Sequence, residues 1–149
     1  MATENKKNKE EALIRALINE FVEAVRVKNV DKIMALHAPN ILLFDLAPPL
    51  QYGGADAYRK NWEEWFPTIE GPVGFEVHDL KITVGDGVAF SHSLNRLSGL
   101  KKNEVKFDLW VRATIGFEIV DGKWVSTHEH ISVPFYMDGS FRAAVDLKP

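Results

Sequence analysis

Residues 111–134 read VRATIGFEIVDGKWVSTHEHISVP, and this stretch decides the fold. Asp121 and Gly122 supply the positive φ angles of a type I′ turn, so they predict a two-residue hairpin. On both sides of the turn apolar and polar residues alternate, which is the period of a half-buried strand. We therefore expect long strands at about residues 104–120 and 123–133.

The alternation continues upstream of the hairpin and then changes to a helical period. Leu13, Leu17, Phe21 and Val25 recur at four-residue spacing, which gives one apolar helix face. The expected elements are helices at residues 10–28, 30–36 and 55–66, a short buried strand at 41–45, and strands at 73–84 and 88–100. Helices first and a strand meander afterwards are typical of an α+β fold. We expect one domain over residues 1–149, with residues 1–9 as a disordered tail.

Composition excludes several classes of protein. The 149 residues include 18 Lys+Arg and 21 Asp+Glu, a net charge of −3, which disfavours a nucleic-acid binder. The absence of cysteine excludes disulfide scaffolds, thiolate metal sites and thiol nucleophiles. No apolar run approaches the ~20 residues of a membrane span, and the polar start lacks a signal core. The sequence therefore predicts a cytoplasmic protein without a membrane or nucleic-acid partner.

The hairpin register predicts which side chains face the core. If Val120 pairs with Lys123, then Ala113 faces His130, and both His128 and His130 lie on the apolar face. A four-residue loop at 101–104 would place His92 opposite Ala113, with Arg96 also inward. Such a face predicts a cavity with an apolar lining and a few polar groups, which is typical of a small-molecule site.

Each candidate site residue also has a structural interpretation. Asp45, in an apolar setting, is either a proton acceptor with a raised pKa or a cap of its own turn. Arg96 either binds a substrate carboxylate or pairs with Asp45 or Glu76. The two histidines are either catalytic or hydrogen-bonded core residues. The aromatic stripe, which is either core or a ligand-stacking wall, comprises Tyr58, Trp62, Trp65 and Phe66.

Metal and cofactor sites have little support in the sequence. His92, His128, His130 and Asp45 include ligand types that metals use, but no spacing signature accompanies them. The glycine pairs lack the spacing of a phosphate loop. We expect neither a metal nor a cofactor.

Three segments carry a resemblance to a known family: FVEAVRVKNVD at 21–31, LFDLAP at 43–48 and DGKWVSTHEHISVP at 121–134. With them the chain resembles the nuclear transport factor two-like superfamily, in its SnoaL-like and ketosteroid-isomerase-like branches. The resemblance implies a cone-shaped α+β barrel, in which three N-terminal helices pack on a strongly curved, mostly antiparallel sheet. It also implies that Asp45 matches the catalytic Asp of the steroid isomerases. Phe21 and Ala113 match their oxyanion-hole positions, where neither residue donates a hydrogen bond.

The leading hypothesis is an isomerase, cyclase or hydratase/hydrolase that acts on a small hydrophobic or partly polar molecule. Asp45 would act as general base and His130 as oxyanion donor or acid. The residues expected to contact the substrate are His92, Arg96, His128, Trp62, Trp65, Tyr58, Phe21 and Ala113. The alternative is a non-catalytic ligand-binding or dimeric interaction module of the same fold.

The opposite sheet face predicts a homodimer. Trp110, Arg112 and Glu129 lie there in the expected register, with an Arg112–Glu129 cross-strand pair beside the outward tryptophan. The resemblance agrees, because members of the fold dimerise through this face. A lone exposed tryptophan is the alternative. The tail at 137–149 packs either on its own domain or on a partner subunit.

Overall fold

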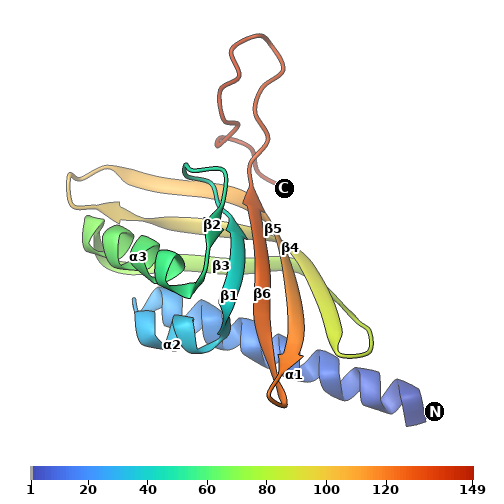
Figure 1. Ribbon diagram of the computed structural model, residues 1–149. Coiled ribbons are helices and arrows are strands. Elements are labelled where there is room, and N and C mark those ends of the chain that lie inside the picture. Colours follow the sequence, from blue (N-terminus) through green and yellow to red (C-terminus); the bar gives the residue numbers. More distant parts are fainter. Residues whose placement is uncertain (1) are drawn as a thin grey trace.

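The computed structural model describes residues 2–149 (Figure 1). Its helices are α1 (Ala2–Arg26), α2 (Val30–Ala35), α3 (Ala55–Trp65) and the short 3-10 helix η1 (Phe66–Thr68). Its strands are β1 (His37–Phe44), β2 (Tyr52–Gly53), β3 (Ile69–Val84), β4 (Val88–Lys101), β5 (Lys106–Val120) and β6 (Lys123–Ser132). Residues 2–9, expected as a disordered tail, are part of α1, because the run KKNKEEA joins good helix formers to the amphipathic stretch that follows.

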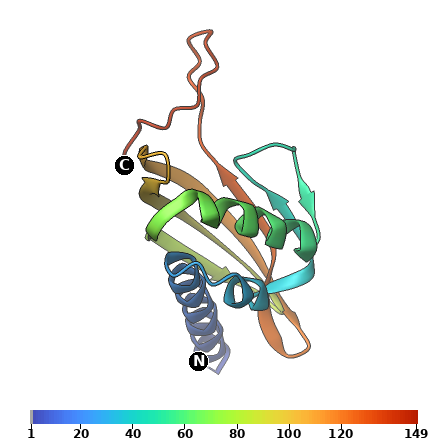
Figure 2. The same cartoon turned by 90° about the vertical axis from the view of Figure 1, so that its left-hand side faces the viewer.

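One sheet contains all six strands in the order β2-β1-β6-β5-β4-β3. Neighbouring strands are antiparallel except β1 and β6, which run parallel. Figures 1 and 2 show the sheet curving around the helices, which lie together on its concave side. This confirms the α+β fold with a curved, mostly antiparallel sheet. The sheet is open rather than a closed barrel, since β2 and β3 are its two edges.

Two local signals in the sequence act as expected. The Asn29 side chain accepts a hydrogen bond from the Lys32 N–H at 3.0 Å and so caps the N-terminus of α2. Asp121 and Gly122 have φ values of 50° and 79°, which are the positive angles of a type I′ hairpin turn. The turn fixes the pairing of Val120 with Lys123 and therefore the register at this end of the sheet.

The core lies between the helices and the concave face of the sheet. One buried cluster joins α1, α2 and β1 to β3 through residues such as Val25, Ile33 and Leu43. A second cluster packs Ile14 and Ile18 of α1 on Phe117 of β5 and on the β6 residue Trp124. Among residues 2–149, no helix is long and apolar enough to cross a membrane.

The register departs from expectation beyond the hairpin. Phe117 pairs with Ser126, but Gly116 pairs with His128, so Thr127 is an extra residue that forms a β-bulge. A bulge turns every later side chain of its strand to the other face. The prediction that His128 and His130 point inward is therefore wrong, and Glu129 points inward instead.

A second shift affects β4. Leu100 pairs with Lys106, so the connection is one residue longer than expected, and His92 faces Thr114 rather than Ala113. The inward prediction for His92 and Arg96 is wrong for this reason. Ser91 and Asn95, their neighbours in the alternation, are buried.

Candidate functional site

A buried carboxylate, Glu129 of β6, is the centre of the polar interior. Its Oε1 lies 2.7 Å from Nε2 of His37, and its Oε2 accepts a hydrogen bond of 2.9 Å from the Tyr58 hydroxyl. Glu129 is 4% exposed, and its two partners are buried as well. A buried carboxylate is costly unless it is paired and hydrogen-bonded, and Glu129 meets both conditions.

His37, the first residue of β1, carries the matching charge. Its Nδ1 lies 2.6 Å from the Ile33 carbonyl oxygen, and its Nε2 faces Glu129. Because both neighbours are acceptors, both ring nitrogens donate, and the ring is an imidazolium. Burial lowers the pKa of His37, but the charge and hydrogen bond of Glu129 outweigh burial, so the net pKa lies above 6.5.

Asp45 follows β1 directly and lies half-buried at the same end of the interior. Burial raises the pKa of Asp45, the Leu46 N–H lowers it, and the nearby Glu129 charge raises it again, with a net increase above 3.8. The Leu46 N–H donates to the Asp45 carboxylate at 2.7 Å. Of the two interpretations of Asp45, the cap of its own turn is observed, and the pKa of the carboxyl group is raised; the role as a proton acceptor stays a prediction.

Helix α3 contributes two side chains with hydrogen-bond donors to this interior, Tyr58 and Trp62. Burial and the charge and hydrogen bond of Glu129 raise the pKa of Tyr58 well above 10, against a smaller lowering by the neighbouring Trp62 N–H, so its hydroxyl keeps its proton. The Trp62 ring lies 5.8 Å from the Tyr58 ring, centroid to centroid. Buried side-chain atoms that have no hydrogen-bond partner within residues 2–149 are Trp62 Nε1, Asn61 Nδ2 and Ser126 Oγ. Such groups normally have a partner in the working protein, either water or a ligand.

The remaining expected contacts on α1, α3 and β5 are core residues. Phe21 packs edge-on against the rings of His37, Trp62 and Phe75, at centroid distances of 5.7, 6.1 and 5.8 Å. Trp62 and Trp65 pack against the first buried cluster. Ala113 is buried on the concave face, opposite Ile131 rather than His130. These aromatic side chains occupy much of the volume in which the sequence predicts a cavity.

The two histidines of β6 lie on the convex face. His128 Nδ1 lies 2.7 Å from the Leu42 carbonyl oxygen, and the His128 and His130 rings pack on Phe44 at 4.8 and 5.4 Å. In the parallel register Leu43 pairs with the inward Glu129, and Phe44 pairs with His130. Asp45 and His130 therefore lie on different sides of the sheet, so His130 cannot act with Asp45 on one substrate.

The expected ligand contacts of β4 are also on the convex face. His92 is exposed. Arg96 donates to both oxygens of Asp108, at 2.9 and 2.6 Å, and to Glu76 at 3.4 Å. The structure therefore shows the second interpretation of Arg96, a pairing with carboxylates of its own chain. Glu76 is one of the two partners expected, and Asp108 takes the place of Asp45.

Of the three residues predicted for the dimer face, Trp110 and Arg112 lie on the convex face and Glu129 does not. Trp110 lies half-buried on the convex face, with its ring 4.8 Å from that of His78. Arg112 donates to the Ser132 hydroxyl at 3.1 Å, so the expected Arg112–Glu129 pair is wrong. Glu129 is turned inward by the bulge and is not part of this face.

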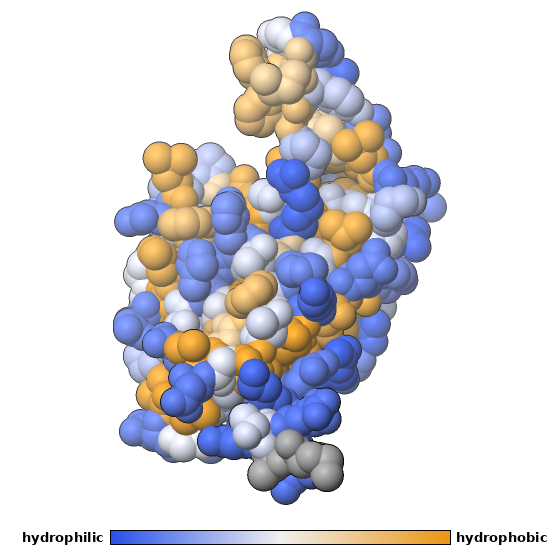
Figure 3. All heavy atoms as spheres, turned by 90° about the vertical axis from the view of Figure 1, so that its right-hand side faces the viewer, coloured by the Kyte–Doolittle hydropathy of each residue, from blue (hydrophilic) through white to orange (hydrophobic). Residues whose placement is uncertain are grey.

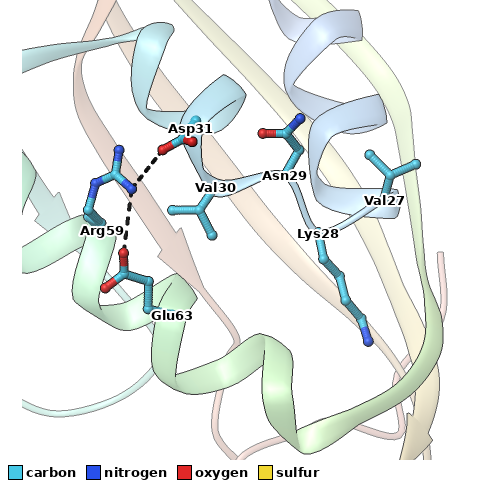
Figure 4. Close-up of a pocket in the computed structure, with 7 residues that line it drawn as sticks. All are labelled: Val27, Lys28, Asn29, Val30, Asp31, Arg59 and Glu63. Carbon is cyan, nitrogen blue, oxygen red and sulfur yellow. Dashed lines mark hydrogen bonds and ion pairs between the residues drawn. The ribbon is translucent and has the colours of Figure 1, made fainter.

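A shallow surface hollow of about 490 Å³ lies between the α1–α2 turn and α3 (Figure 4). Arg59 reaches Asp31 at 2.9 Å and Glu63 at 3.4 Å, while Lys28 points away and donates to the Ile69 carbonyl at 2.6 Å. The charged side chains of the hollow that carry these contacts therefore already pair with one another or with the backbone. Within residues 2–149, no group of three or more His, Asp or Glu side chains is placed to hold a metal ion.

Sequence reasoning missed His37, and it assigned Glu129 to the wrong face. Gly116 was a usable signal, because an isolated glycine inside a strand pattern often marks a bulge. No sequence signal indicated the role of His37. It directly follows the helix expected at residues 30–36, and its partner Glu129 is 92 residues away in the chain.

A curved, open sheet that holds helices and a polar cluster on its concave side defines the cone-fold class of the nuclear transport factor 2-like proteins. The profile of the SnoaL-like domain matches residues 14–136. The chain belongs to this SnoaL-like family.

Solved structures agree with this assignment. An NTF2-like protein of unknown function from Pseudomonas putida is 34% identical, covers 95% of this chain and 98% of its own, and has a TM-score of 0.86. A candidate scytalone dehydratase from Novosphingobium aromaticivorans (19% identity, 97% and 95% coverage, TM-score 0.80) shares the fold. So does a ketosteroid isomerase-like protein from Erwinia carotovora (17% identity, 84% and 96% coverage, TM-score 0.72). Among curated proteins, none matches the chain.

The electrostatics of Asp45 give a prediction that needs no substrate. We expect carbon-detected NMR titration to place its pKa above 3.8, and the Glu129→Gln variant to lower that pKa by removing a like charge. The stability that this carboxyl contributes is fully present below pH 3.8 and is lost as the pH rises through the raised folded-state pKa. A pKa of Asp45 at or below 3.8 would contradict the placement of this group beside Glu129.

Proposed function

We propose that the chain is an enzyme that removes a proton from a small, largely hydrophobic carbonyl compound, with Asp45 as general base. The observation that carries the proposal is a carboxyl group with a raised pKa, Asp45, at the edge of an interior in which the buried Trp62 indole N–H lies beside the Tyr58 hydroxyl and meets no acceptor at full hydrogen-bond geometry within residues 2–149. A base needs a pKa near the working pH, and a developing enolate oxygen needs a donor that is already in place.

In the proposed reaction the Asp45 carboxylate takes the proton from the carbon beside the carbonyl group. The electron pair moves onto the carbonyl oxygen, which accepts a hydrogen bond from Trp62 Nε1. When a hydroxyl group stands on the next carbon, the carbonyl re-forms, a double bond forms between the two carbons as the C–O bond breaks, and the hydroxyl takes the proton from Asp45 and leaves as water. When a double bond stands there, the proton returns to its far carbon and the double bond has moved. These outcomes correspond to the dehydratase and isomerase names of the structural relatives.

Glu129, His37 and Tyr58 have a positioning role in this proposal. The Glu129 carboxylate accepts hydrogen bonds from both partners, and its charge contributes to the raised pKa of Asp45. His130, assigned as acid from the sequence, has no part, because it lies on the convex face. The donor role passes to Trp62.

The test uses α-tetralone, a simple aryl ketone, in heavy water. We expect the wild-type protein to accelerate uptake of deuterium beside the carbonyl group, measured by mass spectrometry, above a buffer blank with acetate. Scytalone and a β,γ-unsaturated steroid ketone are then assayed for water loss and for double-bond movement. No exchange and no turnover with any of the three compounds would contradict the proposal.

A ligand-binding protein without catalysis is the second candidate. The dense aromatic packing of Phe21, Trp62 and Phe75 favours it, because these rings occupy interior volume that a substrate needs. Binding of α-tetralone, detected as a rise in melting temperature without deuterium uptake, would support this candidate over the enzyme.

Association into a homodimer is also part of the proposal. The convex face carries the half-buried Trp110 and Phe90, which is 48% exposed. Apolar side chains on an open sheet face are suited to contact a second copy. Arg112 lies beside them, and Glu129 is no longer assigned to this face.

A further inference from the structure

The segment after β6, residues 133–149, forms an arm with its own internal hydrogen bonds. Phe135 forms a β-bridge with Ala143, and the Tyr136 N–H donates to the Arg142 carbonyl at 2.8 Å. At the tip, the Asp138 carboxylate accepts from the Ser140 N–H at 3.0 Å. Figures 1 and 2 show the arm extending beyond the end of the sheet rather than lying on the helices.

The arm exposes apolar side chains despite its ordered backbone. Met137 is 83% exposed, Phe141 66% and Phe135 52%. The Phe135 and Phe141 rings contact each other at 5.6 Å, centroid to centroid. Figure 3 shows the arm standing clear of the body, with apolar side chains over much of its surface. A two-stranded hairpin alone is at best marginally stable in water, so this arm needs a surface to cover it.

A second apolar segment lies at the same end of the molecule. Residues 45–51, here named the mouth loop, connect β1 to β2 and begin with Asp45. Because β1 and β6 are parallel and Phe44 pairs with His130, the mouth loop and the arm leave the sheet at the same end of the strands. Leu50 is 96% exposed and Leu46 43% exposed, and no residue of the loop after Asp45 is charged.

The arm of one chain does not cover its own mouth loop. In both ribbon views the tip of the arm rises away from the loop (Figures 1 and 2). The end of the arm returns to its own sheet instead: Arg96 lowers the pKa of Asp108 on β5, and Lys148 lowers it further. Because the base of the arm continues from β6 and its tip rises away from the mouth loop of its own chain, the tip lies where a second molecule can meet it.

We infer that the arm of one copy covers the mouth loop of a second copy, and that the second copy does the same in return. The arm (133–149) and the mouth loop (45–51) together hold 24 residues per copy, which is the most that these two segments can contribute, since Ala144 of the arm is buried. A stable interface uses about 20–30 residues on each side. A reciprocal contact of this kind is the isologous type found in two-fold dimers.

The inferred contact places Phe141 and Met137 of one copy beside the mouth loop that begins with Asp45 in the other. This inference rests on the homodimer of the proposed function, but not on the enzyme activity, and the arm substitutions below separate its failure from a failure to dimerise.

The absence of cysteine allows a direct test by engineered disulfides. Purified Leu50→Cys and Phe141→Cys proteins are mixed, exchanged and oxidised. We expect a product of twice the monomer mass, in which mass spectrometry identifies the linked peptides of residues 50 and 141. The matched control mixes Phe141→Cys with Lys123→Cys, at the hairpin at the opposite end of β6, and is expected to give at least about tenfold less linked product.

A second measurement uses substitutions in the arm without cysteine. The double variant Met137→Asp, Phe141→Asp is expected to raise the dimer dissociation constant at least about tenfold, measured by sedimentation velocity. Val120→Asp is the control, because Val120 is also exposed (41%) but lies at the far hairpin. The inference is overturned if the protein is monomeric at all concentrations, or if the mixed Leu50→Cys and Phe141→Cys proteins give no more linked product than the control mixture. It is also overturned if the arm variant dimerises like the control.

Discussion

The Glu129→Gln variant is expected to have a free energy of unfolding about 3–5 kcal/mol lower than the wild-type protein. The substitution leaves the buried His37 ring without its counter-charge and replaces the acceptor of the Tyr58 hydroxyl with a neutral amide. Urea denaturation followed by tryptophan fluorescence measures the difference. The matched control is Glu118→Gln on β5, whose side chain is exposed and for which we expect a change within about 0.5 kcal/mol.

The pH dependence of the same variant gives a second, independent readout. In the wild-type protein the pKa of His37 is raised above 6.5, so its stabilising contribution is fully present below pH 6.5 and is lost as the pH rises through the raised value. Without Glu129 burial dominates and lowers the pKa of His37, so stability should instead increase as the pH rises toward 6.5. The slope of stability against pH near neutrality therefore changes sign.

A double-mutant cycle shows whether the two effects come from one contact. Because His37 and Glu129 touch, the His37→Gln, Glu129→Gln double variant should be more stable than the sum of the single losses predicts. Additive losses, or a single variant as stable as the wild-type protein, would mean that the buried ion pair does not form.

The sequence was a good guide to the fold because its strongest signals are local. The turn at Asp121 and Gly122 and the cap at Asn29 depend on residues a few positions apart, and both are observed. The inward position of Ala113 was also predicted correctly, because Ala113 lies on β5 and the extra residue of the bulge lies on β6.

The candidate site was harder to predict because it depends on register and on long-range contact. One extra residue, Thr127, exchanges the faces of Glu129 and the neighbouring histidines, and alternation by itself cannot reveal an inserted residue. The pairing of Glu129 with His37 joins residues 92 apart in the chain, so no local pattern indicates it. The prediction for Asp45 came from its apolar setting and from the position that the resemblance supplied, and it stays a prediction.

The exchange of faces also changes which chemistry the interior supports. Two inward histidines would have given the site neutral groups that titrate near pH 7. The inward Glu129 instead adds a carboxylate whose charge is matched by the buried His37 ring. The carboxyl group at the edge of this cluster, Asp45, forms no ion pair within residues 2–149, and it is the group to which the proposal assigns the role of base.

The Asp45→Asn variant is expected to exchange the α-proton of α-tetralone about 10²–10⁴-fold more slowly than the wild-type protein, because an amide cannot act as the general base. The rate of the wild-type protein should rise with pH as Asp45 loses its proton, with a midpoint above 3.8. Asp86→Asn, in the exposed turn between β3 and β4, is the control and should retain the wild-type rate. An Asp45→Asn variant with unchanged exchange would remove Asp45 from the proposed reaction.

Stability separates a catalytic role of Asp45 from a structural one. Burial raises the pKa of Asp45, so the charged carboxylate is disfavoured in the folded protein at neutral pH. Asparagine carries no charge and can still accept the hydrogen bond from the Leu46 N–H. Asp45→Asn should therefore be at least as stable as the wild-type protein at pH 7 and lose its advantage below pH 3.8. A residue that lowers stability while it supports turnover is typical of an active site, whereas a cap retained for stability would show the opposite combination.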